Sequence, residues 1–112
     1  MSYDEYDAYQ HEADERNKSA LRQWLSDIQG ISATRNEDFK CVIAAVTAHI
    51  QRNDLLDADY GLHDVNEYLL YRLNRFRGQY CYSTEIRCMK ELLKTIPPVV
   101  TWYEVKDQHV RK

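Results

Sequence analysis

Five basic residues in the second half of the chain have types and spacing that suit anion binding. Arg87, Lys90 and Lys94 stand at i, i+3 and i+7, so a helix would place all three on one side. Arg72 and Arg75 come earlier, near tyrosines, and arginine beside aromatic faces binds phosphates or carboxylates. This basic face is one candidate partner-binding site. The alternative is a solvated face whose long side chains cover an apolar rim.

A second candidate partner-binding site is acidic and aromatic and lies near the first residue. It consists of Asp4, Glu5, Tyr6 and Asp7. Carboxylates can occupy phosphate-binding positions, so this acidic aromatic face could enter a basic groove of another protein, including one that normally holds nucleic acid. The alternative is an acidic helix start that favours the helix dipole.

Catalytic motifs are absent from the sequence. It contains no phosphate loop, dinucleotide-binding glycine motif, nucleophile elbow or zincin helix, since His11-Glu12 is not followed by a second histidine at the required position. Asp54, Asp57 and Asp59 before Gly61 do not fit the calcium-loop template. We therefore expect a non-enzymatic protein with no catalytic residues and no cofactor.

Cysteine usage gives no metal site either. The three cysteines are an odd number without a C-x-x-C pair, which argues against a disulfide framework and against a zinc ribbon. Cys81 and Cys88 with His63 or His109 would have a ligand spacing unlike that of known zinc sites. We expect no metal, and buried or half-buried free thiols.

The basic face requires two helices joined near Gly78. Val65, Leu69, Leu73 and Phe76 share one side of a helix over 64–77, with Asp64 as its N-cap. A second helix over 83–96 carries a similar apolar stripe and stops before Pro97 and Pro98. This basic hairpin, 64–96, resembles a helix-turn-helix unit in outline.

Two earlier helices are expected. A capping box at Ser2 predicts a helix over 3–29, but Gln10 and Asn17 interrupt its apolar stripe, so residues 1–16 are expected to project or to need a partner. A capping box at Thr34 opens a helix over 35–53 with the cleanest apolar spacing in the chain. In it, His49 is expected to be a hydrogen-bonded structural histidine. The three glycines, Gly30, Gly61 and Gly78, are expected at helix ends or turns.

The end of the chain is ambiguous between a strand and a helix. Residues 99–105 contain β-branched residues, yet Thr101 to Glu104 is a capping-box pattern. We expect a docked segment, either extended or a short helix, in which Trp102 or Tyr103 closes the core, and frayed residues over 106–112. The predicted fold is therefore all-α: one small domain, 1–112, with four main helices and this docked segment.

Composition bounds the class of protein. The 112 residues carry a net charge of -3, with -8 over 1–70 (6 basic, 14 acidic) and +5 over 71–112 (9 basic, 4 acidic). No apolar run approaches the roughly 20 residues of a membrane span, and residues 1–15 do not resemble a secretory signal. A cytoplasmic location without membrane contact is the expectation.

The leading functional hypothesis is a small protein-protein inhibitor or adaptor of the sort that phages and mobile elements encode. It would bind another protein through the acidic aromatic face, the basic face or both, and act by steric and electrostatic occlusion. The rival is a nucleic-acid-binding regulator that uses the hairpin 64–96, with Tyr80 or Tyr82 near bases. The acidic first seventy residues weigh against that rival. Homodimerisation through Leu70, Leu92 or Trp102 stays open.

Overall fold

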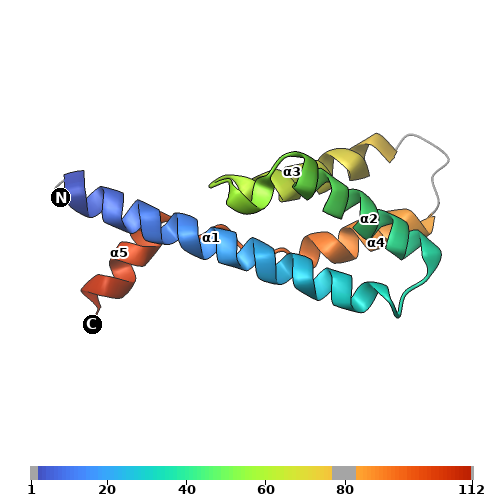
Figure 1. The fold of residues 1–112 in the computed structure, drawn as a ribbon, viewed down its shortest axis with the longest axis horizontal. Coiled ribbons are helices and arrows are strands. Elements are labelled where there is room, and N and C mark those ends of the chain that lie inside the picture. Colours follow the sequence, from blue (N-terminus) through green and yellow to red (C-terminus); the bar gives the residue numbers. More distant parts are fainter. Residues whose placement is uncertain (1–2, 77–82, 112) are drawn as a thin grey trace.

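The computed structural model describes residues 3–76 and 83–111 and shows an all-α fold (Figure 1). The elements are α1 (Tyr3–Ser32), α2 (Glu37–Arg52), the 3-10 turn η1 (Leu55–Asp57), α3 (Gly61–Phe76), α4 (Ser83–Thr95) and α5 (Trp102–Val110). The predicted all-α class with four main helices is confirmed, and the docked end of the chain is a helix. Within the described ranges, none of the helices has the length and apolar character needed to cross a membrane.

The core lies where the second half of α1 meets α2, η1, α3 and α4 (Figure 1). The stripe of α2 supplies five buried residues, and α3 contributes Val65, Leu69 and Leu73, as their spacing predicts. Polar contacts tie α4 to the elements before it: Trp24 Nε1 donates to Thr95 Oγ1 at 2.9 Å, and Arg35 pairs with Glu91 at 2.8 Å. The apolar periodicity therefore specifies the core.

The first half of α1 extends away from α2, α3 and α4 and lies beside α5, so both described ends of the chain lie at the same end of the molecule (Figure 1). The molecule is accordingly elongated, with extents of 54 × 29 × 27 Å. Ala13 is fully buried and Asn17 is 4% exposed. This half of α1, which the sequence predicts to project or to need a partner, has α5 as a neighbour from the same chain.

The start of α3 differs from the prediction. The helix begins at Gly61 rather than at Asp64, whose backbone N–H already donates to Tyr60 O at 2.9 Å. Gly61 is required here because a Cβ atom would collide with the Leu55 carbonyl oxygen and press on Leu21. Asp64 is therefore not an N-cap, and its carboxylate is free to bind a side chain of α2.

The boundary between α1 and α2 also differs in detail. Asn36, not Thr34, is the N-cap of α2, and its Oδ1 accepts the Phe39 N–H at 2.9 Å. The Thr34 hydroxyl instead donates to the Ile31 carbonyl at 2.9 Å, which satisfies an acceptor at the end of α1. Gly30 lies inside α1 and does not end it.

The docked segment closes the core in another way than predicted. Val105 is the fully buried residue of α5, whereas Trp102 is half-buried and Tyr103 is 57% exposed. The larger side chains, Trp102 and Tyr103, lie at the start of α5 and line a hollow on the surface. The buried contact of α5 is therefore made by the smaller Val105. Residues 106–110, for which the sequence predicts fraying, belong to this helix.

Two further expectations about single residues are wrong. Leu92 is 1% exposed and belongs to the core, so it is not available as a dimer contact. Cys41 is exposed rather than buried. Cys88 is buried as expected, and burial raises the pKa of its thiol above 9.0.

Candidate functional site

The predicted basic face divides into two groups. Arg87, Lys90 and Lys94 are exposed on one side of α4, opposite the buried Cys88 and Leu92. No carboxylate of the described residues lies within ion-pair distance of these three cations. The structure thus places a basic stripe on the outer side of α4.

The other group lies along the flank of α3 that faces α2. Arg72 is half-buried, and its Nη1 donates to the Tyr68 hydroxyl at 3.3 Å. The Tyr68 ring stacks on His49 of α2, with centroids 3.9 Å apart and an interplanar angle of 8°. Arg75 is exposed one turn further on. Gly78, Tyr80 and Tyr82, which the sequence places between the two groups, lie outside the described residues.

His49 has the structural role expected of it. Its Nε2 lies 2.7 Å from Asp64 Oδ1, and its Nδ1 lies 3.4 Å from the Asn53 amide nitrogen. Both ring nitrogens are therefore engaged by side chains of α2 and α3 or of the turn between them. The imidazole links α2 to α3 beside the Tyr68 ring.

The predicted acidic aromatic face does not form a single face. Asp4, Glu5 and Asp7 are all exposed, but successive helical residues diverge by about 100°. Glu5 and Asp7 therefore lie on opposite sides of Tyr6, and Asp4 points almost directly away from it. Tyr6 itself turns toward α5, where its ring meets Trp102 edge-on with centroids 5.0 Å apart. Of these four residues, Tyr6 alone lines the concave surface described below.

That concave surface is held in place by the segment 96–101, which connects α4 to α5. Asn17 binds the backbone of Val100 twice: its Nδ2 donates to Val100 O at 3.0 Å, and its Oδ1 accepts the Val100 N–H at 2.7 Å. Pro97 and Pro98 remove two N–H groups from the segment and keep it out of a helix. The segment therefore crosses α1 at a fixed register and positions the start of α5.

We call the larger hollow beside this segment the aromatic groove; its volume is about 450 Å³. Residues of α1, of the turn before α3, of the segment 96–101 and of α5 line it: Tyr6, Gln10, Asp14, Asn17, Asp59, Tyr60, His63, Val99, Val100, Thr101, Trp102 and Tyr103. The lining includes four aromatic rings and two carboxylates, and neither lysine nor arginine. It is thus an acidic aromatic surface, although it differs from the one predicted.

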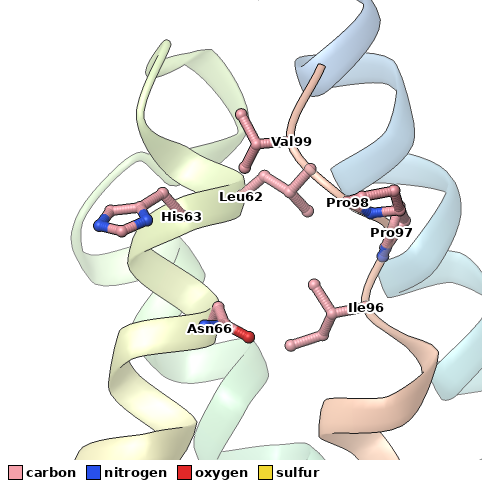
Figure 2. Close-up of a pocket in the computed structure, with 7 residues that line it drawn as sticks. All are labelled: Leu62, His63, Asn66, Ile96, Pro97, Pro98 and Val99. Carbon is pink, nitrogen blue, oxygen red and sulfur yellow. The ribbon is translucent and has the colours of Figure 1, made fainter. Parts of the chain in front are cut away.

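A smaller hollow of about 220 Å³ adjoins the aromatic groove, because His63 and Val99 line both. Figure 2 shows Leu62 extending from α3 toward the segment 96–101, and Ile96 extending back toward α3. Pro97, Pro98 and Asn66 complete the lining. We call it the apolar hollow, and together the two hollows follow the segment 96–101.

The carboxylates near the groove are partly engaged. Gln10 Nε2 donates to Asp14 Oδ1 at 2.8 Å, and Lys18 Nζ lies 3.1 Å from Asp59 Oδ1 and 3.6 Å from Glu15 Oε1. The hydrogen bond to Asp59, followed by the charges of Asp59 and Glu15, raises the pKa of the Lys18 ammonium against the opposing effect of desolvation. One cation thus pairs with two carboxylates along this edge, and Asp14 adds a third carboxylate without a cation among the described residues, so the edge stays acidic.

The candidate zinc cluster is not assembled from the described residues. Cys88 is buried in the core, and Cys81 lies outside the described ranges. His109 lies at the other end of the molecule, where its Nε2 is 3.4 Å from both oxygens of Glu12. In the part of the chain that the structure describes, no group of three His, Cys, Asp or Glu side chains could hold a metal ion.

Sequence reasoning missed most of the aromatic groove. The sequence does not mark Asp59 or Tyr60 as part of a binding site, and it predicts that Trp102 or Tyr103 closes the core. One usable signal was Asn17, an amide within an apolar stripe, which indicates a buried polar partner. Another was the pair of prolines, which predicts an extended crossing segment.

Comparisons with known proteins give no relative for this chain. No protein-family model matches it, and neither a curated protein nor a solved structure matches it. The candidate site therefore rests on its own geometry.

Proposed function

We propose that this chain is a non-enzymatic binding protein that holds a segment of another protein in the aromatic groove and acts as a small inhibitor or adaptor. One observation carries the proposal: three aromatic side chains at the groove remain solvent-accessible. Tyr60 is 61% exposed, Tyr103 57% and Tyr6 37%. Tyrosine and tryptophan are enriched in protein interfaces, because they bury large rigid surfaces at low entropic cost.

The charge of the groove favours a protein over a nucleic acid as the ligand. Asp14 and Asp59 line it without any lysine or arginine, and Asp7 lies two turns before Asp14 on the same side of α1. A polyanion would be repelled from this surface, whereas a basic or apolar protein segment would not. Occupation of the groove would block other contacts of the bound partner, in the cytoplasm as the sequence leads us to expect.

Affinity capture with matched variants tests the proposal. The immobilised protein is exposed to a bacterial lysate, with and without nuclease, as wild type, as Tyr60→Ala/Tyr103→Ala and as Leu70→Ala/Tyr71→Ala. Leu70 and Tyr71 are 37% and 65% exposed on α3, outside the groove, and serve as the control. We expect a stoichiometric protein partner that survives nuclease, is lost with the groove variant and is retained by the control variant. Equal capture by both variants, or recovery of nucleic acid alone, would overturn the proposal.

The basic stripe on α4 supports a second candidate function, regulation through nucleic-acid binding. Arg87, Lys90 and Lys94 share one exposed side without a carboxylate partner among the described residues. Reversal of all three charges should abolish binding to random duplex or single-stranded nucleic acid, and wild-type binding should weaken steeply with salt. An absence of wild-type binding at low salt would exclude this function.

A further inference from the structure

The aromatic groove and the apolar hollow differ in chemistry although they adjoin. The groove is lined by two carboxylates, Asp14 from α1 and Asp59 from the turn before α3, and by four tyrosine and tryptophan rings. The apolar hollow is lined by aliphatic and proline side chains together with Asn66 and His63. A ligand that lies along the segment 96–101 would therefore meet an acidic aromatic site next to an apolar one.

Each carboxylate of the groove retains binding capacity. Asp14 and Asp59 each bind a partner in the described chain through one oxygen, Oδ1, and the Asp59 side chain is 62% exposed. The Oδ2 atoms have no hydrogen-bond partner among the described residues. The Oδ2 oxygen of either carboxylate could accept a charge-assisted hydrogen bond from a cation in the groove.

Thr101, which also lines this groove, carries a third acceptor. The Thr101 hydroxyl oxygen is shielded from solvent and has no hydrogen-bond partner in the described part of the chain. Shielded polar atoms in folded proteins are nearly always paired. A donor group on a ligand that enters the groove would satisfy this oxygen after rotation of the side chain.

We propose that the aromatic groove is a receptor for the guanidinium group of an arginine, carried by an extended segment of a partner protein whose neighbouring apolar side chain fills the apolar hollow. The inference rests on the proposed function and names the chemistry of the ligand. Arginine fits because its planar cation stacks on tyrosine and tryptophan rings and presents several donors at once. A hydrophilic neutral side chain would leave Asp14, whose only partner among the described residues is the neutral amide of Gln10, without a counter-charge.

The test uses N-acetyl-arginine amide as the probe and N-acetyl-citrulline amide as its uncharged isostere. Each is titrated into the full-length ¹⁵N-labelled protein, and the Trp102 indole N–H signal and the amides of Val99 to Trp102 are followed by NMR. We expect the arginine probe to shift these signals with a dissociation constant of roughly 1–10 mM. The citrulline probe should bind at least about ten-fold more weakly, since it lacks the charge.

Paired variants show whether the named carboxylates bind the cation. Asp14→Asn/Asp59→Asn should weaken arginine binding by about ten-fold or more. The control Asp27→Asn/Asp54→Asn changes the net charge equally at two exposed positions outside the groove, and should leave binding unchanged. Circular dichroism checks that both double variants remain folded. Equal shifts by the two probes, no shift by the arginine probe, or equal loss in the two variants would overturn the inference.

These outcomes separate the inference from the proposed function. If partner capture depends on Tyr60 and Tyr103 while the arginine probe shifts nothing, the guanidinium receptor is excluded and protein binding stands. If neither capture nor the probe depends on the groove, both are excluded.

Discussion

The side-chain amide of Asn17 pairs with both backbone polar groups of Val100: it donates to the carbonyl oxygen at 3.0 Å and accepts from the N–H at 2.7 Å. The two residues are 83 positions apart in sequence. Asn17 is 4% exposed, so neither bond competes freely with water. This pairing sets the position of the segment 96–101 across α1, and with it the shape of the aromatic groove.

Asn17→Ala should therefore destabilise the protein by about 2 kcal/mol, because both polar atoms of Val100 lose their partner in a shielded site. Urea unfolding followed by circular dichroism measures the change. Gln23→Ala, which removes an exposed amide that donates to Asp27 at 2.8 Å on the same helix, should change stability by less than about 0.5 kcal/mol. Equal effects of the two substitutions would show that the Asn17 pairing does not stabilise the fold.

Two glycines should respond in opposite directions to the same substitution. Gly61→Ala places a methyl group against the Leu55 carbonyl and Leu21, and should cost about 1–3 kcal/mol through overpacking. Gly30→Ala meets no atom within 4 Å inside α1, and should stabilise by up to about 1 kcal/mol, because alanine restricts the unfolded chain. The midpoints of thermal and urea unfolding measure the stability of both variants. A Gly61→Ala protein as stable as the wild type would contradict the close packing at the start of α3.

The reactivity of the cysteine thiols should depend on whether they are buried. In a Cys81→Ser background, the exposed Cys41 should react rapidly with a disulfide reagent such as DTNB, whereas Cys88 should react only on unfolding. Rapid modification of both thiols in the folded protein would contradict the burial of Cys88.

Burial of Cys88 also predicts a pH dependence. Its pKa is raised in the folded protein, first of all by desolvation, so the folded state holds this proton more tightly than the unfolded state. The contribution of Cys88 to stability is then fully present below its unfolded pKa of about 9 and declines as pH rises above it. Comparison of alkaline unfolding in wild type and Cys88→Ala measures this, and parallel pH profiles would exclude the effect.

His49→Ala should destabilise the protein by about 1–2 kcal/mol, because it removes the contact to Asp64 and the stack on Tyr68. His63→Ala is the matched control: His63 is exposed on α3, and its loss should change stability by less than about 0.5 kcal/mol. Urea titrations give the free energy of unfolding of each variant. If His49→Ala is as stable as the wild type, the contacts of His49 between α2 and α3 do not stabilise the fold.

The helices and most of the core could be predicted from the sequence because they depend on local periodicity. The stripes of α2 and α3 are buried as their spacing indicates. The helix starts were less predictable, since Gly61 is dictated by the Leu55 carbonyl and by Leu21, forty residues earlier in the chain. Thr34 and Asp64 both stand in sequence patterns typical of an N-cap, but neither residue is an N-cap in the structure.

The candidate site could hardly be predicted, because it is assembled from residues distant in sequence. Only Tyr6 of the predicted acidic aromatic face lines the groove. Asn17 looked like a defect in an apolar stripe, since its partner is a backbone group 83 positions away. The basic stripe of α4 was predictable as geometry, because a single helix determines it.

The docking of α5 on the first half of α1 has a consequence for synthesis on the ribosome. Glu12 and Arg16 contact His109 and Gln108 across 97 and 92 positions of sequence, so the opening helix emerges long before the helix that covers it. Contacts between such distant residues are slow to form, because the intervening loop must first close. The nascent chain therefore carries an uncovered helix face until α5 has left the exit tunnel and can pack on α1.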